Sequence, residues 1–109
     1  MSISGWIGVD LDGTVAHYES KQFPEIGRPI APMVARIKAW LAEGVDVRIF
    51  TARVCDGDPE TVLSIQEWCA EHIGQVLPVT NVKDYAMVEL WDDRAVQVIP
   101  NTGRMAVDR

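Results

Sequence analysis

The sequence has few of the residues that would place a protein outside the cell or in a membrane. It contains only two cysteines, Cys55 and Cys69, among 109 residues, which is too few for a disulfide framework and favours two reduced thiols. No segment approaches the roughly 20 apolar residues of a membrane span. The N-terminus also lacks the basic segment and long apolar core of a signal peptide. These absences predict a cytoplasmic protein that has no membrane partner.

Positive charge is also scarce. Lysine and arginine number 10 against 16 aspartates and glutamates, so the formal net charge is −6. This balance argues against a surface that binds nucleic-acid backbone or an anionic membrane. The length and the apolar content of 48% predict one globular domain over residues 1–109, with a single core.

An acidic motif follows directly on the first apolar run, Trp6–Val9. Asp10 and Asp12 are two residues apart at the end of a predicted strand, so their side chains lie on one side of the chain. Gly13 then allows a sharp turn. Two close carboxylates repel each other, and a divalent cation relieves that repulsion. The motif therefore suits metal-assisted phosphoryl transfer, with one carboxylate as nucleophile and the other as proton shuttle.

Further polar residues stand at the ends of later predicted strands or in loops. They are Thr51 after the strand 45–50, Lys83 in the loop 80–84, and Asp92 and Asp93 after the strand 88–91. The carboxyl ends of parallel strands meet at one edge of a sheet, where ligands bind in open α/β folds. The strand pattern alone thus predicts that these residues converge on one site.

These motifs, in this order, resemble those of the haloacid dehalogenase (HAD) superfamily: DxDGT/V, a strand-terminal Thr or Ser, a Lys and a final acidic pair. The resemblance spans residues 10–93. It implies that Asp10 is a nucleophile that forms an aspartyl-phosphate, and that Asp12 protonates the leaving oxygen and then activates water. It also implies Mg²⁺, held by Asp10, the backbone carbonyl of Asp12 and Asp92. Asp93 is either a further ligand through water or the residue that orients Lys83.

The same resemblance implies a phosphorylated substrate, bound by Thr51, Ala52, Arg53 and Lys83. Thr51 offers a hydroxyl and a backbone N–H to a phosphate oxygen, and Lys83 is a compact cation suited to phosphate. Arg53 either reaches the substrate or lies on the surface. The catalytic set is Asp10, Asp12, Thr51 and Lys83.

The predicted elements alternate between strands and helices. Helices are expected at about 32–43 and 59–72, and strands at 5–10, 45–50, 76–79, 88–91 and 95–99. Strands joined by helices imply a parallel sheet covered on both faces. The expected fold is therefore a three-layer, Rossmann-like α/β fold with a mainly parallel five-stranded sheet.

The chain leaves no room for the cap domain that many members of this superfamily insert. Residues 15–31 hold only a flap, and residues 52–82 are filled by one helix and one strand. A lid that excludes water is then absent, or it comes from another subunit of a homo-oligomer.

Three functions fit these motifs. The first is a Mg²⁺-dependent phosphatase that acts on a phosphate monoester. The second is a receiver-like phosphoacceptor module, which carries its phosphorylated Asp on a middle strand and its acidic pair near the first. The third is a non-catalytic protein that binds a phosphorylated ligand on the same scaffold. The order of the motifs favours the phosphatase, because the DxDGT motif closes the first strand and the acidic pair a late one.

Overall fold

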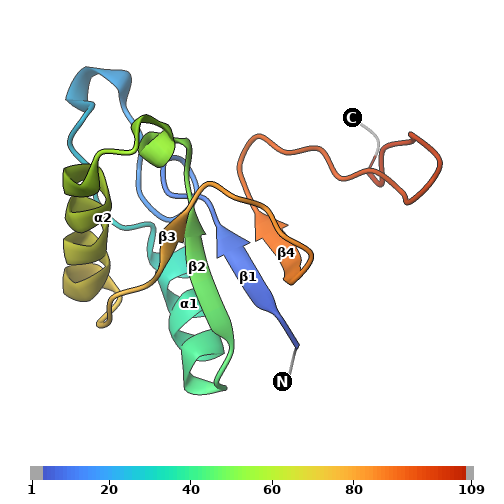
Figure 1. Cartoon of the computed structure of the whole chain (residues 1–109), viewed down its shortest axis with the longest axis horizontal. Helices are drawn as coiled ribbons and strands as arrows, with labels where there is room; N and C mark the ends of the chain where they lie inside the picture. Colours follow the sequence, from blue (N-terminus) through green and yellow to red (C-terminus); the bar gives the residue numbers. More distant parts are fainter. Residues whose placement is uncertain (1–3, 108–109) are drawn as a thin grey trace.

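A four-stranded parallel sheet is the frame of the chain in the computed structural model, which describes residues 4–107 (Figure 1). The elements in chain order are β1 (Trp6–Val9), η1 (Ser20–Gln22), α1 (Ala31–Ala42), β2 (Asp46–Phe50), η2 (Ala52–Asp56), α2 (Pro59–His72), β3 (Val79–Thr80) and β4 (Met87–Trp91), where η denotes a 3₁₀ helix. The strand order is β3-β2-β1-β4, and every pair is parallel. The α/β class, the parallel sheet and both predicted helices are confirmed.

Local signals explain where the helices begin and end. The Asp58 side chain accepts a hydrogen bond of 2.9 Å from the Glu60 backbone N–H, so it caps α2, and Pro59 occupies the first turn. This is the pairing of cap and proline that the sequence predicts. Gly44, with φ of 83°, follows α1 and reverses the chain into β2.

Both helices cover the same face of the sheet, so the expected three-layer arrangement is wrong. One core cluster joins the inward side chains of β1 and β2 to those of both helices. It includes Ile7, Val9, Val47, Ile49, Met33, Val34, Ile37, Ile65, Trp68 and Cys69. The reason is topological, because right-handed crossovers from β1 to β2 and on to β3 proceed in one direction. The return to β4 passes through residues 81–86, which hold no helix.

On the uncovered face of the sheet, side chains of β2 cover Trp6 of the central strand β1. Trp6 is only 1% exposed. The Arg48 guanidinium lies 4.6 Å from the centre of the Trp6 ring, and the Phe50 ring lies 6.5 Å from it. Arg48 thereby covers apolar surface with its stem while its charge pairs with Asp46 at 2.9 Å.

The sheet has four strands where five were expected. The third strand is shifted, because Pro78 has no N–H to donate and pairing with β2 begins at Val79. The expected strand 95–99 does not join the sheet. Its side chains are exposed, and only Val98 forms an isolated antiparallel bridge, with Met105.

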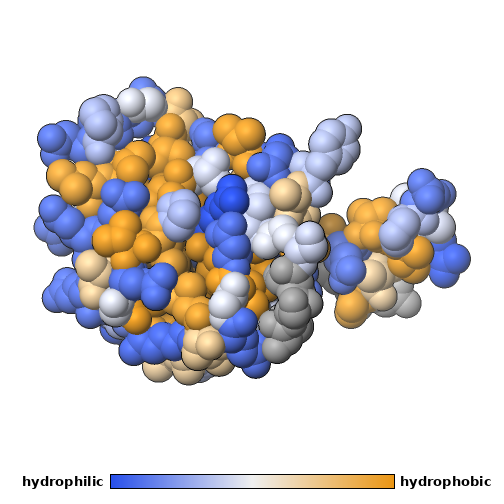
Figure 2. All heavy atoms as spheres, turned by 60° about the horizontal axis from the view of Figure 1, so that its bottom comes forward, coloured by the Kyte–Doolittle hydropathy of each residue, from blue (hydrophilic) through white to orange (hydrophobic). Residues whose placement is uncertain are grey.

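The C-terminal segment leaves the sheet after β4. Arg94 N–H donates to the Asp92 carboxylate at 2.7 Å, in a bend that directs the chain outward. Residues 97–106 then fold back on themselves through backbone bonds such as Ile99 N–H to the Arg104 carbonyl, at 2.8 Å. Figures 1 and 2 show this segment as a separate lobe joined to the domain by a narrow neck.

Within residues 4–107, no inserted cap domain is present, and the segment between β1 and α1 is a flap. Its base is closed by His17 N–H to the Arg28 carbonyl and by Ile30 N–H to the Val15 carbonyl, both at 2.8 Å. In the same range, no helix has the length and apolar character needed to cross a membrane.

This architecture predicts different costs for truncating apolar side chains in the core and in the C-terminal lobe. Ile37→Ala should lower the free energy of unfolding by about 2–5 kcal/mol, because Ile37 is fully buried between helix and sheet. Val98→Ala should change it by less than about 0.5 kcal/mol, because Val98 is exposed. Urea denaturation of the two variants measures both values. A loss of comparable size for Val98→Ala would show that the lobe packs on the domain.

Candidate functional site

The carboxyl ends of β1, β2 and β4 meet at one edge of the sheet, and the polar residues predicted from the sequence lie there. Asp10 N–H donates to the Trp91 carbonyl at 2.9 Å, so the residue after β1 is bonded to the last residue of β4. Asp92 follows immediately. On the other side, Thr51 N–H donates to the Thr80 carbonyl at 2.9 Å, which fixes the residue after β2.

Three carboxylates form an acidic cluster at this edge. One oxygen from each of Asp10, Asp92 and Asp93 lies within 4.8 Å of the others. Partial burial, the hydrogen-bonding contact with Asp93 and the negative charge of Asp92 together raise the pKa of Asp10 from 3.8 to about 7. Repulsion of this kind is relieved by a cation, and carboxylate oxygens are the ligands that Mg²⁺ prefers. The donor set therefore fits a divalent metal ion.

The turn after the first motif brings Asp93 into the cluster. The Thr14 hydroxyl donates to the Asp93 carboxylate at 3.2 Å and accepts from the Asp93 backbone N–H at 3.1 Å. A side chain at Gly13 would collide with the Asp93 carboxylate, and Gly13 has φ of 86°. Glycine is required at this position on both counts. Asp93 thus faces Asp10 and Thr14.

Asp10, Thr51, Ala52 and Asp92 line one open hollow of about 530 Å³, a volume within the range of small-ligand sites. The Thr51 side chain is buried, and its hydroxyl accepts from the Arg53 backbone N–H at 3.2 Å. That hydroxyl keeps its own proton for donation to a ligand. Three of the predicted residues therefore surround a space beside Asp10.

Lys83 lies in the connection from β3 to β4 and is exposed. It lines a second hollow together with Asp92 and Ala95, and these two residues also line the hollow that contains Asp10. The two hollows therefore adjoin at Asp92 and Ala95, and Lys83 lines the second of them. Within the described part of the chain, its ammonium group forms no hydrogen bond or ion pair.

The Asp12 side chain is not part of the acidic cluster and pairs with Arg53. The Arg53 Nε donates to Asp12 Oδ2 at 2.7 Å, and Nη2 donates to Oδ1 at 2.9 Å. This fork-on-fork geometry is the strong form of an Arg–carboxylate pair. Asp10 and Asp12, two residues apart in the motif, are therefore placed in different surroundings.

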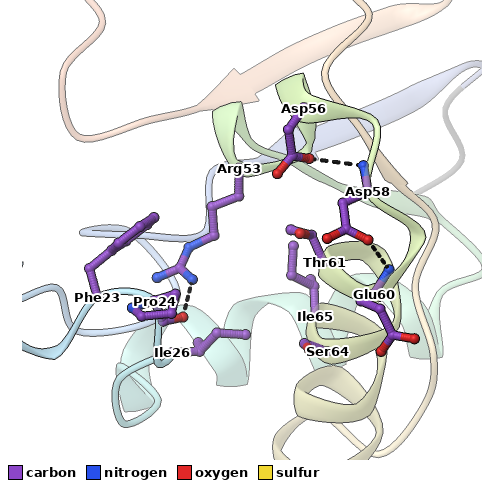
Figure 3. Close-up of a pocket in the computed structure, with 10 residues that line it drawn as sticks. All are labelled: Phe23, Pro24, Ile26, Arg53, Asp56, Asp58, Glu60, Thr61, Ser64 and Ile65. Carbon is purple, nitrogen blue, oxygen red and sulfur yellow. Dashed lines mark hydrogen bonds between the residues drawn. The ribbon is translucent and has the colours of Figure 1, made fainter.

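Arg53 also forms a wall of a cavity of about 400 Å³ between the flap and α2 (Figure 3). The flap contributes an apolar side, with Phe23, Pro24 and Ile26. The opposite side consists of η2 and the start of α2, where Asp56 and Asp58 lie. The cavity is on the Asp12 side of the site.

Several contacts of the site could not be identified from the sequence. The sequence places Arg53 two residues after Thr51, but it gives no sign of the bond to Asp12, which is 41 positions away. Thr14 belongs to the first motif, yet its role in holding Asp93 depends on a contact across 79 positions. Arg94 lines the hollow beside Asp10, and its position directly after the acidic pair is a signal that could have suggested it.

Comparison with known proteins supports the fold. A solved structure of a conserved protein from Bacteroides thetaiotaomicron superposes with a TM-score of 0.67. The two chains are 24% identical, over 91% of this chain and 84% of the other. At this identity the likeness shows the fold alone. No protein-family model matches the chain, and no curated protein matches it.

The raised pKa of Asp10 predicts how stability depends on pH without metal. Between pH 4 and 7 the folded protein holds a proton on Asp10 that the unfolded chain has lost, because the pKa falls from about 7 to 3.8 on unfolding. The free energy of unfolding should therefore decrease as the pH rises through this range. We expect this decrease in the free energy of unfolding to be about 1–2 kcal/mol, because the Asp10 carboxyl group is only partly buried and solvent screens it.

Urea denaturation at pH 5 and pH 7.5, in buffer containing EDTA, measures this effect. Asp10→Asn should show a smaller decrease than the wild type by that amount, since it cannot titrate. Equal decreases in both proteins would contradict the raised pKa of Asp10.

Proposed function

We propose that the chain is a Mg²⁺-dependent phosphatase that hydrolyses a phosphate monoester through an aspartyl-phosphate intermediate. The observation that carries this proposal is the meeting of Asp10, Asp92 and Asp93 within 4.8 Å, beside a hollow lined by Thr51. The order of the motifs and their resemblance to the HAD superfamily support it further.

Asp10, Asp92 and Asp93 are the side chains that would hold the metal ion, with the backbone carbonyl of Asp12 as the ligand that the resemblance implies. A bound Mg²⁺ would neutralise the carboxylates and the phosphate, so that negative charge could accumulate at this edge of the sheet. The Asp12 carboxylate is engaged by Arg53, which leaves its side chain outside the metal cluster.

In the first step, a carboxylate oxygen of Asp10 attacks phosphorus as the ester P–O bond breaks. In its protonated form, in which one of its two hydrogen bonds from Arg53 is released, Asp12 gives its proton to the leaving oxygen, so an alcohol departs. In the second step Asp12 takes a proton from water, whose oxygen bonds to phosphorus while the bond to Asp10 breaks. Inorganic phosphate leaves, and both aspartates return to their starting states.

Thr51 and Lys83 would bind the phosphate group. Thr51 offers its hydroxyl proton from a buried position, and Lys83 offers a cation without a competing partner among the described residues. Ala52 lines the same hollow and contributes its backbone N–H.

Metal dependence is the direct test of this proposal. Hydrolysis of 4-nitrophenyl phosphate should require Mg²⁺ and disappear in excess EDTA, because the carboxylates would otherwise repel the phosphate dianion. A steady-state assay with and without the metal measures this. Full activity in EDTA would overturn the mechanism.

The two aspartates of the first motif should have separable roles. Asp10→Asn should lower kcat by about 10³-fold or more, because the nucleophile is lost. Asp12→Asn should lower it by about 10²–10⁴-fold, the usual contribution of acid–base catalysis, and phosphoenzyme should accumulate. Rapid quench and intact mass spectrometry measure the covalent species.

Asp46→Asn is a control for these measurements, because Asp46 begins β2, at the opposite end of that strand from Thr51 and the acidic cluster. Near-normal turnover by Asp10→Asn would exclude Asp10 as the nucleophile. A stable phosphoprotein that forms from acetyl phosphate, without turnover of any monoester, would instead favour the receiver-like alternative.

A further inference from the structure

We propose that Arg53 is a positioning residue that holds the Asp12 carboxylate and couples its position to the flap. The catalytic part of this inference rests on the proposed phosphatase function. Arg53 was expected either to reach the substrate or to lie on the surface, and in the structure its guanidinium group bonds to Asp12 and to the flap.

The contact with Asp12 is two-pronged and shielded from water. Both Asp12 oxygens accept hydrogen bonds, at 2.7 Å from Nε and 2.9 Å from Nη2. The Arg53 side chain is 8% exposed, and that of Asp12 is 22% exposed. A bidentate pair at a largely buried position fixes the rotation of the carboxylate as well as its distance.

The rest of the guanidinium group is bonded to the flap. Nη1 donates to the Pro24 carbonyl, and Nη2 donates to the Glu25 carbonyl at 3.3 Å. The Phe23 ring lies against the group, 4.8 Å from the Arg53 Cζ to the ring centre. Figure 3 shows the Arg53 side chain directed at this part of the flap. One side chain thus joins the tip of the flap to a residue of the first motif.

The flap is held independently on its other side. The Trp68 indole N–H of α2 donates to the Gly27 carbonyl at 2.9 Å. A side chain at Gly27 would collide with the His17 carbonyl. The outgoing arm of the flap, at His17, and its returning arm, at Gly27, therefore approach closely. The base is therefore fixed to the domain, while residues 18–25 beyond it are exposed. Arg53 is the side chain that bonds this exposed part to the site.

These contacts leave Arg53 little capacity to bind phosphate. A guanidinium group has five N–H donors, and four hydrogen bonds to Asp12 and the flap are already made. One N–H, on Nη1, is left, so a two-pronged contact with phosphate would require breaking one of these bonds. Removing Arg53 should therefore affect proton transfer by Asp12 more than substrate binding.

The leaving group provides a test that a merely structural role would not pass. An alkyl phosphate requires a proton on its leaving oxygen, whereas 4-nitrophenolate is a stable anion and requires little help. Arg53→Ala should lower kcat for an alkyl phosphate by about 100-fold and for 4-nitrophenyl phosphate by less than about tenfold. KM should change by less than about threefold for both substrates.

Chemical rescue separates positioning from folding. Guanidinium ion at millimolar concentration should restore part of the alkyl phosphatase activity of Arg53→Ala, because the ion can occupy the position of the missing side-chain guanidinium group and pair with both Asp12 oxygens. Arg53→Lys should remain impaired, since an ammonium group cannot pair with both oxygens in the same plane.

Arg48→Ala is the matched control. Arg48 makes the same kind of two-pronged pair with Asp46, at 3.3 and 2.9 Å, on the uncovered face of the sheet. This variant should keep the wild-type ratio of alkyl to aryl turnover and should not respond to guanidinium.

Hydrogen exchange of the flap provides a readout that needs no turnover. The Gln22, Phe23 and Glu25 amides are hydrogen-bonded within the flap. Arg53→Ala and Asp12→Asn should each increase their exchange, by several-fold for the first variant and by less for the second, whereas Arg48→Ala should leave it unchanged. Mass spectrometry of the peptide covering residues 18–27 measures this.

The possible outcomes separate the two proposals. Raised KM at unchanged kcat in Arg53→Ala, or unchanged flap exchange, would overturn the positioning role while the phosphatase function stood. Equal losses for both leaving groups, without rescue by guanidinium, would overturn it too. Absence of turnover in the wild type, with flap exchange altered as expected, would overturn the phosphatase function and leave the coupling of Asp12 to the flap in place.

Discussion

The parallel pairing of β1 with β2 on one side and β4 on the other determines where Asp10, Thr51 and Asp92 lie. All four residues of β1 are buried, so the register of this strand is strongly fixed. Val9 pairs with both Ile49 and Trp91. Asp10 after β1 and Asp92 after β4 therefore lie side by side at the carboxyl edge of the sheet. Thr51 follows β2 at the same edge. A shift of one residue in any strand would disperse them.

That alignment brings carboxylates close together, and their repulsion is unfavourable. Three carboxylates at one edge repel, and the pKa of Asp10 rises to about 7 because of burial and its acidic neighbours. The chain could reduce this repulsion by turning Asp93 outward. Instead, Thr14 holds Asp93 through two hydrogen bonds, and Gly13 leaves the space its carboxylate occupies. Local interactions thus maintain an arrangement that is unfavourable without a cation, which is typical of a functional site.

The sequence predicts best the parts of the structure that depend on local patterns. The cap at Asp58, the apolar face of α1 and the strand before Asp10 were predicted because each depends on neighbouring residues. The segment 95–99 was misleading, since alternation of Val96 and Val98 with polar residues is also compatible with an exposed hairpin. Likewise, covering the second face of the sheet would need a further helix, and the expected strands 76–79 and 88–91 already leave too few residues between them for one. The pair of Asp12 with Arg53 joins residues 41 positions apart, which no local pattern indicates.

The flap takes on particular importance because the described chain has no cap. A flap of this length buries little apolar surface of its own, so its position depends on a few directed contacts with the domain. Trp68 fixes its returning arm, and Arg53 fixes its tip. The two side chains are held by different parts of the molecule. Trp68 is packed in the core, whereas Arg53 is bonded to Asp12. Movement of the tip would therefore be transmitted to the first motif, whereas movement of the returning arm would be resisted by the core. The Arg53 guanidinium group can in this way couple the position of the flap to the position of the Asp12 carboxylate.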